Sequence, residues 1–72
     1  MPSWRELRRF CERDDWVLYK DTDHYFYRKE SDDGNIRHVK VSKETGEIRH
    51  YLWREILNKQ LQVTLAYFNG KI

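Results

Sequence analysis

The amino-acid sequence predicts a two-layer α+β fold of order α-β-β-β-α, with two helices on one face of a three-stranded antiparallel sheet. Three observations support this class. Apolar residues recur at helical spacing near both ends of the chain. Between them the residues are aromatic, β-branched or alternate between apolar and polar types, as strands do. Polar turn sequences separate these extended stretches, so we expect the strands to form a meander.

The first helix is predicted to run from about Trp4 to about Asp14. The tetrapeptide Ser3–Glu6 has the Ser-x-x-Glu form of a capping box, which satisfies backbone groups at a helix start. Leu7 and Cys11 then follow at helical spacing, with Phe10 beside them. The apolar face of this helix is therefore expected to cover the sheet.

Three extended runs are predicted to be strands: Trp16–Tyr19, His24–Lys29 and Ile36–Val41. The polar stretches Lys20–Asp23 and Ser31–Asn35 lie between them and are expected to form the turns.

The register of the second hairpin decides which side chains face the helices, because a slip of one residue reverses every side chain. A two-residue turn at Asp33–Gly34 would place Phe26 and Arg28 on the same face as Val39 and Val41.

A three-residue loop, Asp32–Gly34, with its glycine left-handed, would instead place Tyr25 and Tyr27 beside those valines. We favour this second register. It buries two aromatic side chains with the valines, and it leaves Arg28 and Lys40 in water rather than under a helix.

A second apolar stripe predicts an amphipathic helix from about Arg49 to about Gln60. Thr64 is expected to cap a short last helical turn, after which Gly70 releases the chain. The stripe of the second helix consists of Ile48, Leu52, Ile56 and Leu57.

The chain of 72 residues is expected to form a single domain, residues 1–72. Its one cysteine, Cys11, cannot pair within the chain and is expected to be buried and inert. The three histidines are too scattered for a zinc site, so we expect no metal and no cofactor.

No apolar run is long enough to span a bilayer, and no signal peptide is recognisable. We therefore expect a cytoplasmic protein that does not enter membranes. The three tryptophans are expected to lie in the core: Trp4, Trp16 and Trp53.

The favoured register leaves one sheet face open. On that face aromatic rings mix with cations, and the two groups suit RNA because rings stack on bases and Arg or Lys binds phosphates. A mixed surface that binds nothing has the same composition, so the pattern alone does not decide. The open face is expected to carry Val17, Tyr19, His24, Phe26, Arg28, His38 and Lys40. The candidate RNA-binding residues among them are Tyr19, Phe26, Arg28, His38 and Lys40.

His24 is the candidate catalytic residue. It stands at the head of a strand directly after a polar turn. An imidazole can take or give a proton near neutral pH, as RNA cleavage by transesterification requires. Lys40 or Arg28 would screen the phosphate charge. His38 could be a second proton-transfer group or only a strand surface residue. For His24 too the simpler alternative is a surface histidine held by a neighbouring carboxylate.

Two stretches of the chain, residues 4–16 and 20–28, resemble the HicA toxin family, and the likeness extends through Val39–Val41 and Leu52–Leu57 to Val63–Thr64 and Phe68. The resemblance implies a fold similar to double-stranded-RNA-binding domains and ribonuclease action on messenger RNA. It further implies neutralisation by a HicB-type antitoxin. His24 corresponds to the histidine of the family's Gly-Ser-His element and would be catalytic.

The sequence departs from the family at several glycines. Thr22 and Asp23 replace the Gly and Ser of the Gly-Ser-His element, and Asp15 replaces a glycine before the first strand. The family's glycine after the second helix is replaced around Leu61–Gln62. Asp23 could stabilise the charged form of the neighbouring imidazole, or it could repel an RNA phosphate.

Two other functions fit the same residues. A non-catalytic RNA-binding module would use the open face without cleavage, with Thr22 and Asp23 marking the loss of activity. A protein-interaction domain would use Tyr19 and Phe26 as hydrophobic anchors.

Overall fold

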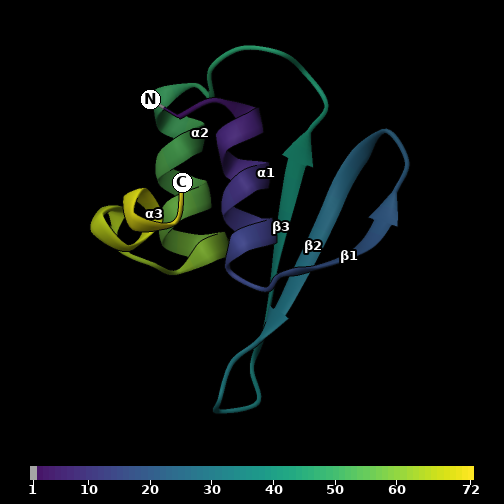
Figure 1. Cartoon of the computed structure of the whole chain (residues 1–72), viewed down its shortest axis with the longest axis vertical. Coiled ribbons are helices and arrows are strands. Elements are labelled where there is room, and N and C mark those ends of the chain that lie inside the picture. Colours follow the sequence, from purple (N-terminus) through teal and green to yellow (C-terminus); the bar gives the residue numbers. More distant parts are fainter. Residues whose placement is uncertain (1) are drawn as a thin grey trace.

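The computed structural model describes residues 2–72 and has the predicted α-β-β-β-α order and two-layer α+β class. Its strands form one antiparallel sheet in the order β1-β2-β3. In Figure 1 the helices lie together on the side of β3, and β1 forms the far edge of the sheet. The elements are α1 (Trp4–Arg13), β1 (Val17–Asp21), β2 (His24–Glu30), β3 (Ile36–Ser42), α2 (His50–Glu55), η1 (Ile56–Leu61) and α3 (Leu65–Lys71).

The first helix begins as the sequence predicts. The Ser3 hydroxyl accepts a hydrogen bond from the Glu6 amide at 3.1 Å, and the Glu6 carboxylate accepts one from the Ser3 amide at 2.9 Å. This reciprocal pair is a complete capping box. The helix ends with Asp15 in the left-handed region, at φ 62°, and the Trp16 amide bonds back to the carbonyl of Cys11 at 2.9 Å. A left-handed residue after the last turn therefore redirects the chain into β1.

The favoured register of the second hairpin is confirmed. Tyr25 pairs with Val41 and Tyr27 with Val39. The loop glycine, Gly34, has the left-handed φ of 89° that the three-residue loop requires. One face of the sheet therefore packs against the helices and the other is open.

The core lies between the sheet and the helices, and the three tryptophans belong to it as predicted. Burial also raises the pKa of the Cys11 thiol, so the thiolate form is disfavoured. The core residues are Trp4, Leu7, Phe10, Cys11, Trp16, Tyr27, Val39, Val41, Ile48, Trp53, Ile56, Leu61 and Phe68.

The second half of the predicted second helix differs from expectation. Residues 50–55 are α-helical, but Ile56–Leu61 form a π-helix that ends at Gln62, whose φ is 57°. The wider turn brings the carbonyl of Leu61 within 2.6 Å of the Arg37 guanidinium, and it brings the Gln60 side chain to the Lys40 amide at 3.4 Å. The π-helix η1 therefore lies along the outer edge of β3.

The third helix is longer than the predicted single turn. Thr64 caps it, as predicted, by accepting a hydrogen bond from the Tyr67 amide at 3.1 Å. Gly70 lies inside Leu65–Lys71 and does not release the chain, so that prediction is wrong. The helix continues because Phe68 is buried against Phe10 and Trp53.

Candidate functional site

The open face of the sheet carries the residues that the sequence analysis assigned to it. In the pairing of β2 with β3, His24 stands opposite Ser42, Phe26 opposite Lys40 and Arg28 opposite His38. These pairs alternate with the tyrosine–valine pairs that face the helices. The five candidate RNA-binding residues therefore share one surface with His24.

Four aromatic side chains form a continuous row on this face, which we call the ring row: His24, Phe26, Tyr19 and His38. Their ring centres are 6.4 Å apart for His24 and Phe26 and 6.2 Å for Phe26 and Tyr19. Tyr19 and His38 complete the row at 5.7 Å. Tyr19 is 47% exposed, so the row offers stacking surface to a ligand.

A bulge in β1 accounts for the position of Tyr19. Leu18 pairs with Tyr27, but the next paired residue is Lys20, opposite Phe26, so Tyr19 is the extra residue of β1. Both Tyr19 and Lys20 then contact the open face. The sequence pattern placed Tyr19 there without predicting the bulge, and it missed Lys20.

Two cations lie against the ring row. The Lys20 ammonium is 5.2 Å from the centre of the Phe26 ring, and the Arg28 guanidinium is 6.0 Å from that of Tyr19. Such contacts hold a cation beside an aromatic face while leaving it in water. The row therefore presents stacking surface and positive charge together, which is the combination that single-stranded nucleic acids require.

His24 lies at one end of the ring row and lines a cleft of about 380 Å³, which we call the His24 cleft. The side chain is half-buried, and its Nδ1 atom is shielded from solvent without a hydrogen-bond partner among residues 2–72. No carboxylate, including that of Asp23, therefore holds the imidazole through Nδ1.

The His24 cleft contains charges of both signs. Lys40 and Arg49 supply cations, and Glu44 and Glu47 supply carboxylates. A histidine beside cations can exchange a proton with a bound phosphodiester while the cations screen its charge. Carboxylates in the same cleft can serve as additional proton acceptors.

The structure does not bring His38 to His24. Their strand pairs are separated by the Phe26–Lys40 pair, so the two residues lie four positions apart along the hairpin. At the rise of a β-strand this is about 13 Å between Cα atoms. His38 therefore lies too far along the row to act on the same phosphate as His24, and its exposed ring belongs to the stacking surface.

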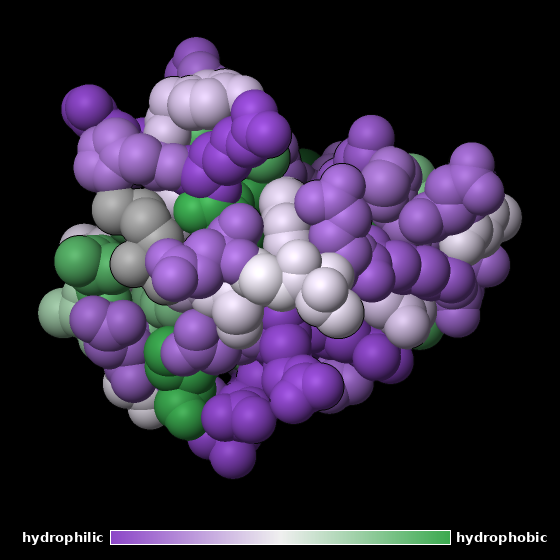
Figure 2. Space-filling view, turned by 90° about the horizontal axis from the view of Figure 1, so that it is seen from above, coloured by the Kyte–Doolittle hydropathy of each residue, from purple (hydrophilic) through white to green (hydrophobic). Residues whose placement is uncertain are grey.

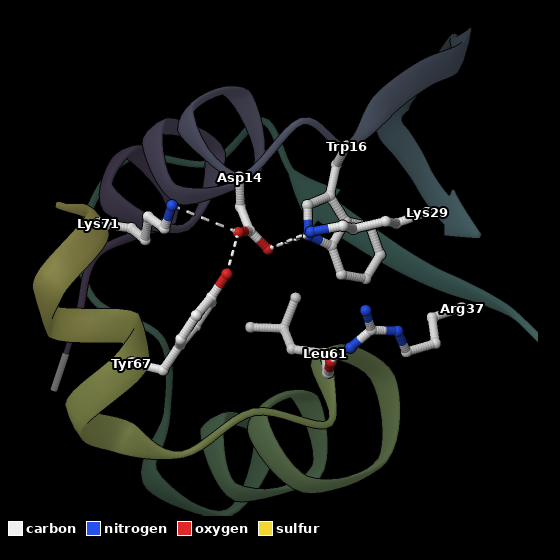
Figure 3. Close-up of polar contacts among 7 residues, drawn as sticks. All are labelled: Asp14, Trp16, Lys29, Arg37, Leu61, Tyr67 and Lys71. Atoms are coloured by element: carbon white, nitrogen blue, oxygen red, sulfur yellow. Dashed lines mark hydrogen bonds and ion pairs between the residues drawn. The ribbon is translucent and has the colours of Figure 1, made fainter. Parts of the chain in front are cut away.

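A buried carboxylate, which the sequence analysis did not single out, organises the opposite end of the molecule (Figure 3). Asp14 is 3% exposed. Its Oδ2 accepts hydrogen bonds from Trp16 Nε1 and Lys29 Nζ, each at 3.0 Å, and its Oδ1 accepts one from the Tyr67 hydroxyl at 2.5 Å. The Lys71 ammonium lies 3.8 Å from Oδ1.

Burial by itself raises the pKa of Asp14, but the hydrogen bonds from Tyr67, Lys29 and Trp16 outweigh it and hold that pKa below its usual range. The hydrogen bond that the Tyr67 hydroxyl donates to Asp14 raises the pKa of Tyr67. Trp16 lies in the same turn as Asp14, Lys29 lies on β2, and Tyr67 and Lys71 lie on α3. The cluster therefore joins the end of α1 to β2 and α3 and is a structural centre.

Within residues 2–72 no group of three or more His, Cys, Asp or Glu side chains could hold a metal ion. In the same part of the chain, no helix has the length and apolar character needed to cross a membrane. Comparison with protein-family models, with curated proteins and with solved structures gave no match to this chain.

Proposed function

We propose that this protein is an RNA-cleaving toxin of the HicA type, which binds RNA on its open sheet face and uses His24 for acid–base catalysis. The observation that carries the proposal is the position of His24. The half-buried imidazole lies in a cleft at the end of an exposed row of aromatic rings flanked by cations. This arrangement joins a stacking surface for bases to a proton-transfer group.

The backbone gives the resemblance additional support. The HicA family has glycines where this chain has Asp15 and, after the second helix, Leu61–Gln62. Asp15 and Gln62 are the non-glycine residues among 2–72 with positive φ, at 62° and 57°. Glycine favours this left-handed conformation. At both places where the family has glycine, this chain therefore adopts a conformation that glycine favours, which supports the proposed resemblance.

The proposed reaction is transesterification. The 2′-oxygen of a ribose attacks the adjacent phosphorus and loses its proton to a base, while the bond from phosphorus to the 5′-oxygen breaks. A proton is delivered to that leaving oxygen, and the products are a 2′,3′-cyclic phosphate and a 5′-hydroxyl. His24 performs one of the two proton transfers, and Lys40, which lines the same cleft, screens the phosphate charge.

The partners that follow from this proposal are messenger RNA or another RNA and a HicB-type antitoxin protein that blocks the toxin. Action on messenger RNA would make the cytoplasm the site of the proposed activity. The proposed RNA contacts are Tyr19 and Phe26 by stacking, Arg28 and Lys40 by charge, and His38 at the far end of the ring row.

The direct test is to incubate purified protein with a mixed RNA and to compare wild type with His24→Ala and His50→Ala. His50 is an exposed histidine at the start of α2 and serves as the matched control. We expect cleavage by wild type and by His50→Ala and none by His24→Ala. Induced expression should arrest growth, and His24→Ala should relieve the arrest. Equal cleavage by both variants would remove the catalytic role of His24.

One observation favours a second candidate, a non-catalytic RNA-binding module on the same fold. Catalytic histidines are commonly oriented by a hydrogen bond to the second ring nitrogen, and Nδ1 of His24 has no such partner among the described residues. This candidate predicts salt-sensitive RNA binding without cleavage, and a His24→Ala variant that binds about as well as wild type.

A further inference from the structure

A second cleft lies beside the His24 cleft, with a volume of about 420 Å³. Residues Trp4, Ser42 and Glu44 line both clefts, so the two adjoin along the start of the β3–α2 loop. Figure 2 looks onto this end of the molecule and shows it covered mainly by hydrophilic residues. We call the second cleft the Arg–Lys cleft, because Arg5, Arg8 and Lys43 line it.

Arg8 is held in this cleft by contacts with two tyrosines. Its guanidinium lies 4.1 Å from the centre of the Tyr25 ring. Its Nε donates to the Tyr27 hydroxyl at 3.2 Å, and one terminal nitrogen donates to the Tyr25 hydroxyl at 3.3 Å. Five N–H groups are available on a guanidinium, so donors remain for a ligand. An arginine fixed in this way binds an anion with little loss of side-chain entropy.

Lys43 approaches the same tyrosine ring from the β3–α2 loop, with its ammonium 4.8 Å from the centre of Tyr25. It also pairs with Asp21 at 2.6 Å, and this contact raises the pKa of Lys43. Arg5 precedes Arg8 by three positions on α1, a spacing that places both on one face of the helix. Two cations therefore lie against one aromatic ring, and Arg5 lines the same cleft.

The carboxylates near the cations of the Arg–Lys cleft include Glu44, Glu12 and Asp21, and Asp21 is paired with Lys43 in an exposed contact. Glu44 is the one carboxylate that lines it. Glu12 lies 3.8 Å from Nε of Arg8, in an exposed pair of the kind that contributes little. The start of α1 is already satisfied by its capping box, so the attraction for an anion comes from the side chains.

We propose that the Arg–Lys cleft binds a phosphate group of the same RNA strand whose reacting phosphate lies in the His24 cleft. The inference rests on the proposed function and adds a second phosphate site to it. The cations of this cleft recognise a phosphate by charge, and the guanidinium of Arg8 adds directed N–H donors. The shared wall of the two clefts allows one strand to pass from the first to the second.

The test measures binding of a single-stranded RNA oligomer by fluorescence anisotropy at several salt concentrations. The variants are Arg5→Gln and Lys43→Gln, which remove charge without removing the tyrosine contacts of Arg8. Arg9→Gln is the matched control on α1, since Arg9 is exposed one turn after Arg5 and does not line the cleft. Lys59→Gln is the matched control for Lys43→Gln, because Lys59 is also an exposed lysine that pairs with a carboxylate, that of Glu55 at 3.2 Å.

We expect each cleft variant to weaken binding at low salt by about three- to tenfold and to lower the slope of log affinity against log salt by about 0.7, the value of one phosphate contact on a single strand. The controls should stay within twofold of wild type. Equal losses in the cleft variants and the controls would show that the charges act only diffusely and would overturn the inference.

A second measurement separates this inference from the proposed function. A nucleoside 3′,5′-bisphosphate is titrated while the backbone amide signals of the full chain are followed by NMR. If the amide signals around Arg8 and Lys43 shift but the protein does not bind RNA, the cleft is a phosphate site and the RNA-cleaving proposal is overturned. If wild type cleaves RNA but Arg5→Gln and Lys43→Gln bind RNA as tightly as the controls do, only the second site is overturned. No RNA binding and no shifts would overturn both.

Discussion

The Lys29 ammonium lies 3.0 Å from Oδ2 of Asp14, in a pair whose side chains are 26% and 4% exposed. This ion pair joins the middle strand of the sheet to the turn that follows α1. Because the carboxylate also accepts hydrogen bonds from Trp16 and Tyr67, it holds three elements at one point. The stability of so small a domain should depend strongly on this one side chain.

Asp14→Asn should lower the free energy of unfolding by about 2 kcal/mol, because three donors that now bond to a charged carboxylate would face a neutral amide and form weaker hydrogen bonds. For a domain of this size the loss corresponds to about 10 °C in Tm. Thermal unfolding followed by circular dichroism measures it. Glu55→Gln, which breaks the exposed pair with Lys59, is the control and should cost less than about 0.5 kcal/mol. Equal effects of the two substitutions would contradict a special role for Asp14.

The pKa of Asp14, which lies below its usual range, predicts how stability depends on pH. A depressed native pKa means that the unfolded state binds the proton more readily, so the contribution of Asp14 is fully present above the unfolded pKa of about 3.9. It is lost as the pH falls through the native pKa. Urea unfolding should therefore show a constant difference between wild type and Asp14→Asn from pH 7 to about pH 5 and a shrinking one below about pH 4. A difference that grew on acidification would contradict this assignment.

Asp15→Gly should stabilise the protein by about 0.5–1 kcal/mol. Asp15 holds a φ of 62°, where a side chain costs energy that glycine avoids. The control is Arg9→Gly, at an exposed position inside α1, which should destabilise by about 1 kcal/mol because glycine disfavours helix. Denaturant midpoints compare the two variants with wild type. A destabilising Asp15→Gly would indicate that the left-handed backbone carries no strain.

Phe26→Ala should weaken the binding of single-stranded RNA by about 1–3 kcal/mol, since Phe26 contacts both His24 and Tyr19 within the ring row. Leu65→Ala is the control, because Leu65 is a 51% exposed apolar residue of α3 that lies outside the row and lines neither cleft. Anisotropy titrations at one salt concentration measure both. Similar losses for the two variants would remove the open face as the RNA-binding surface.

Much of the fold follows from local chemistry, and this is why the sequence predicts it. The capping box of Ser3 and Glu6 depends on residues three positions apart. The hairpin register depends on a loop glycine and on which face buries two tyrosines. The open face follows from that register, so the row of candidate RNA-binding residues could be predicted as a set.

Other features depend on contacts between distant residues, and the sequence does not reveal them. Asp14 is followed by a second aspartate and has the pattern of a solvated helix end. Its partners Lys29 and Tyr67 lie 15 and 53 positions away. The π-helix depends on contacts of η1 with Arg37 and Lys40 of β3, and the bulge places Lys20 beside Phe26. The clefts form where α1, the strand ends and the β3–α2 loop meet, which no local pattern specifies.

The covered edge of β3 has a consequence for self-association. The Gln60 side chain bonds to the Lys40 amide and the Leu61 carbonyl to the Arg37 side chain, so a foreign strand would have to displace η1 to pair there. Backbone groups are accessible for pairing at β1 instead, where the bulge interrupts a regular ladder. Growth of the sheet is therefore restricted to one side. Two molecules that met through β1 would use up their accessible edges and form a closed pair, which protects the chain against stacking into fibres.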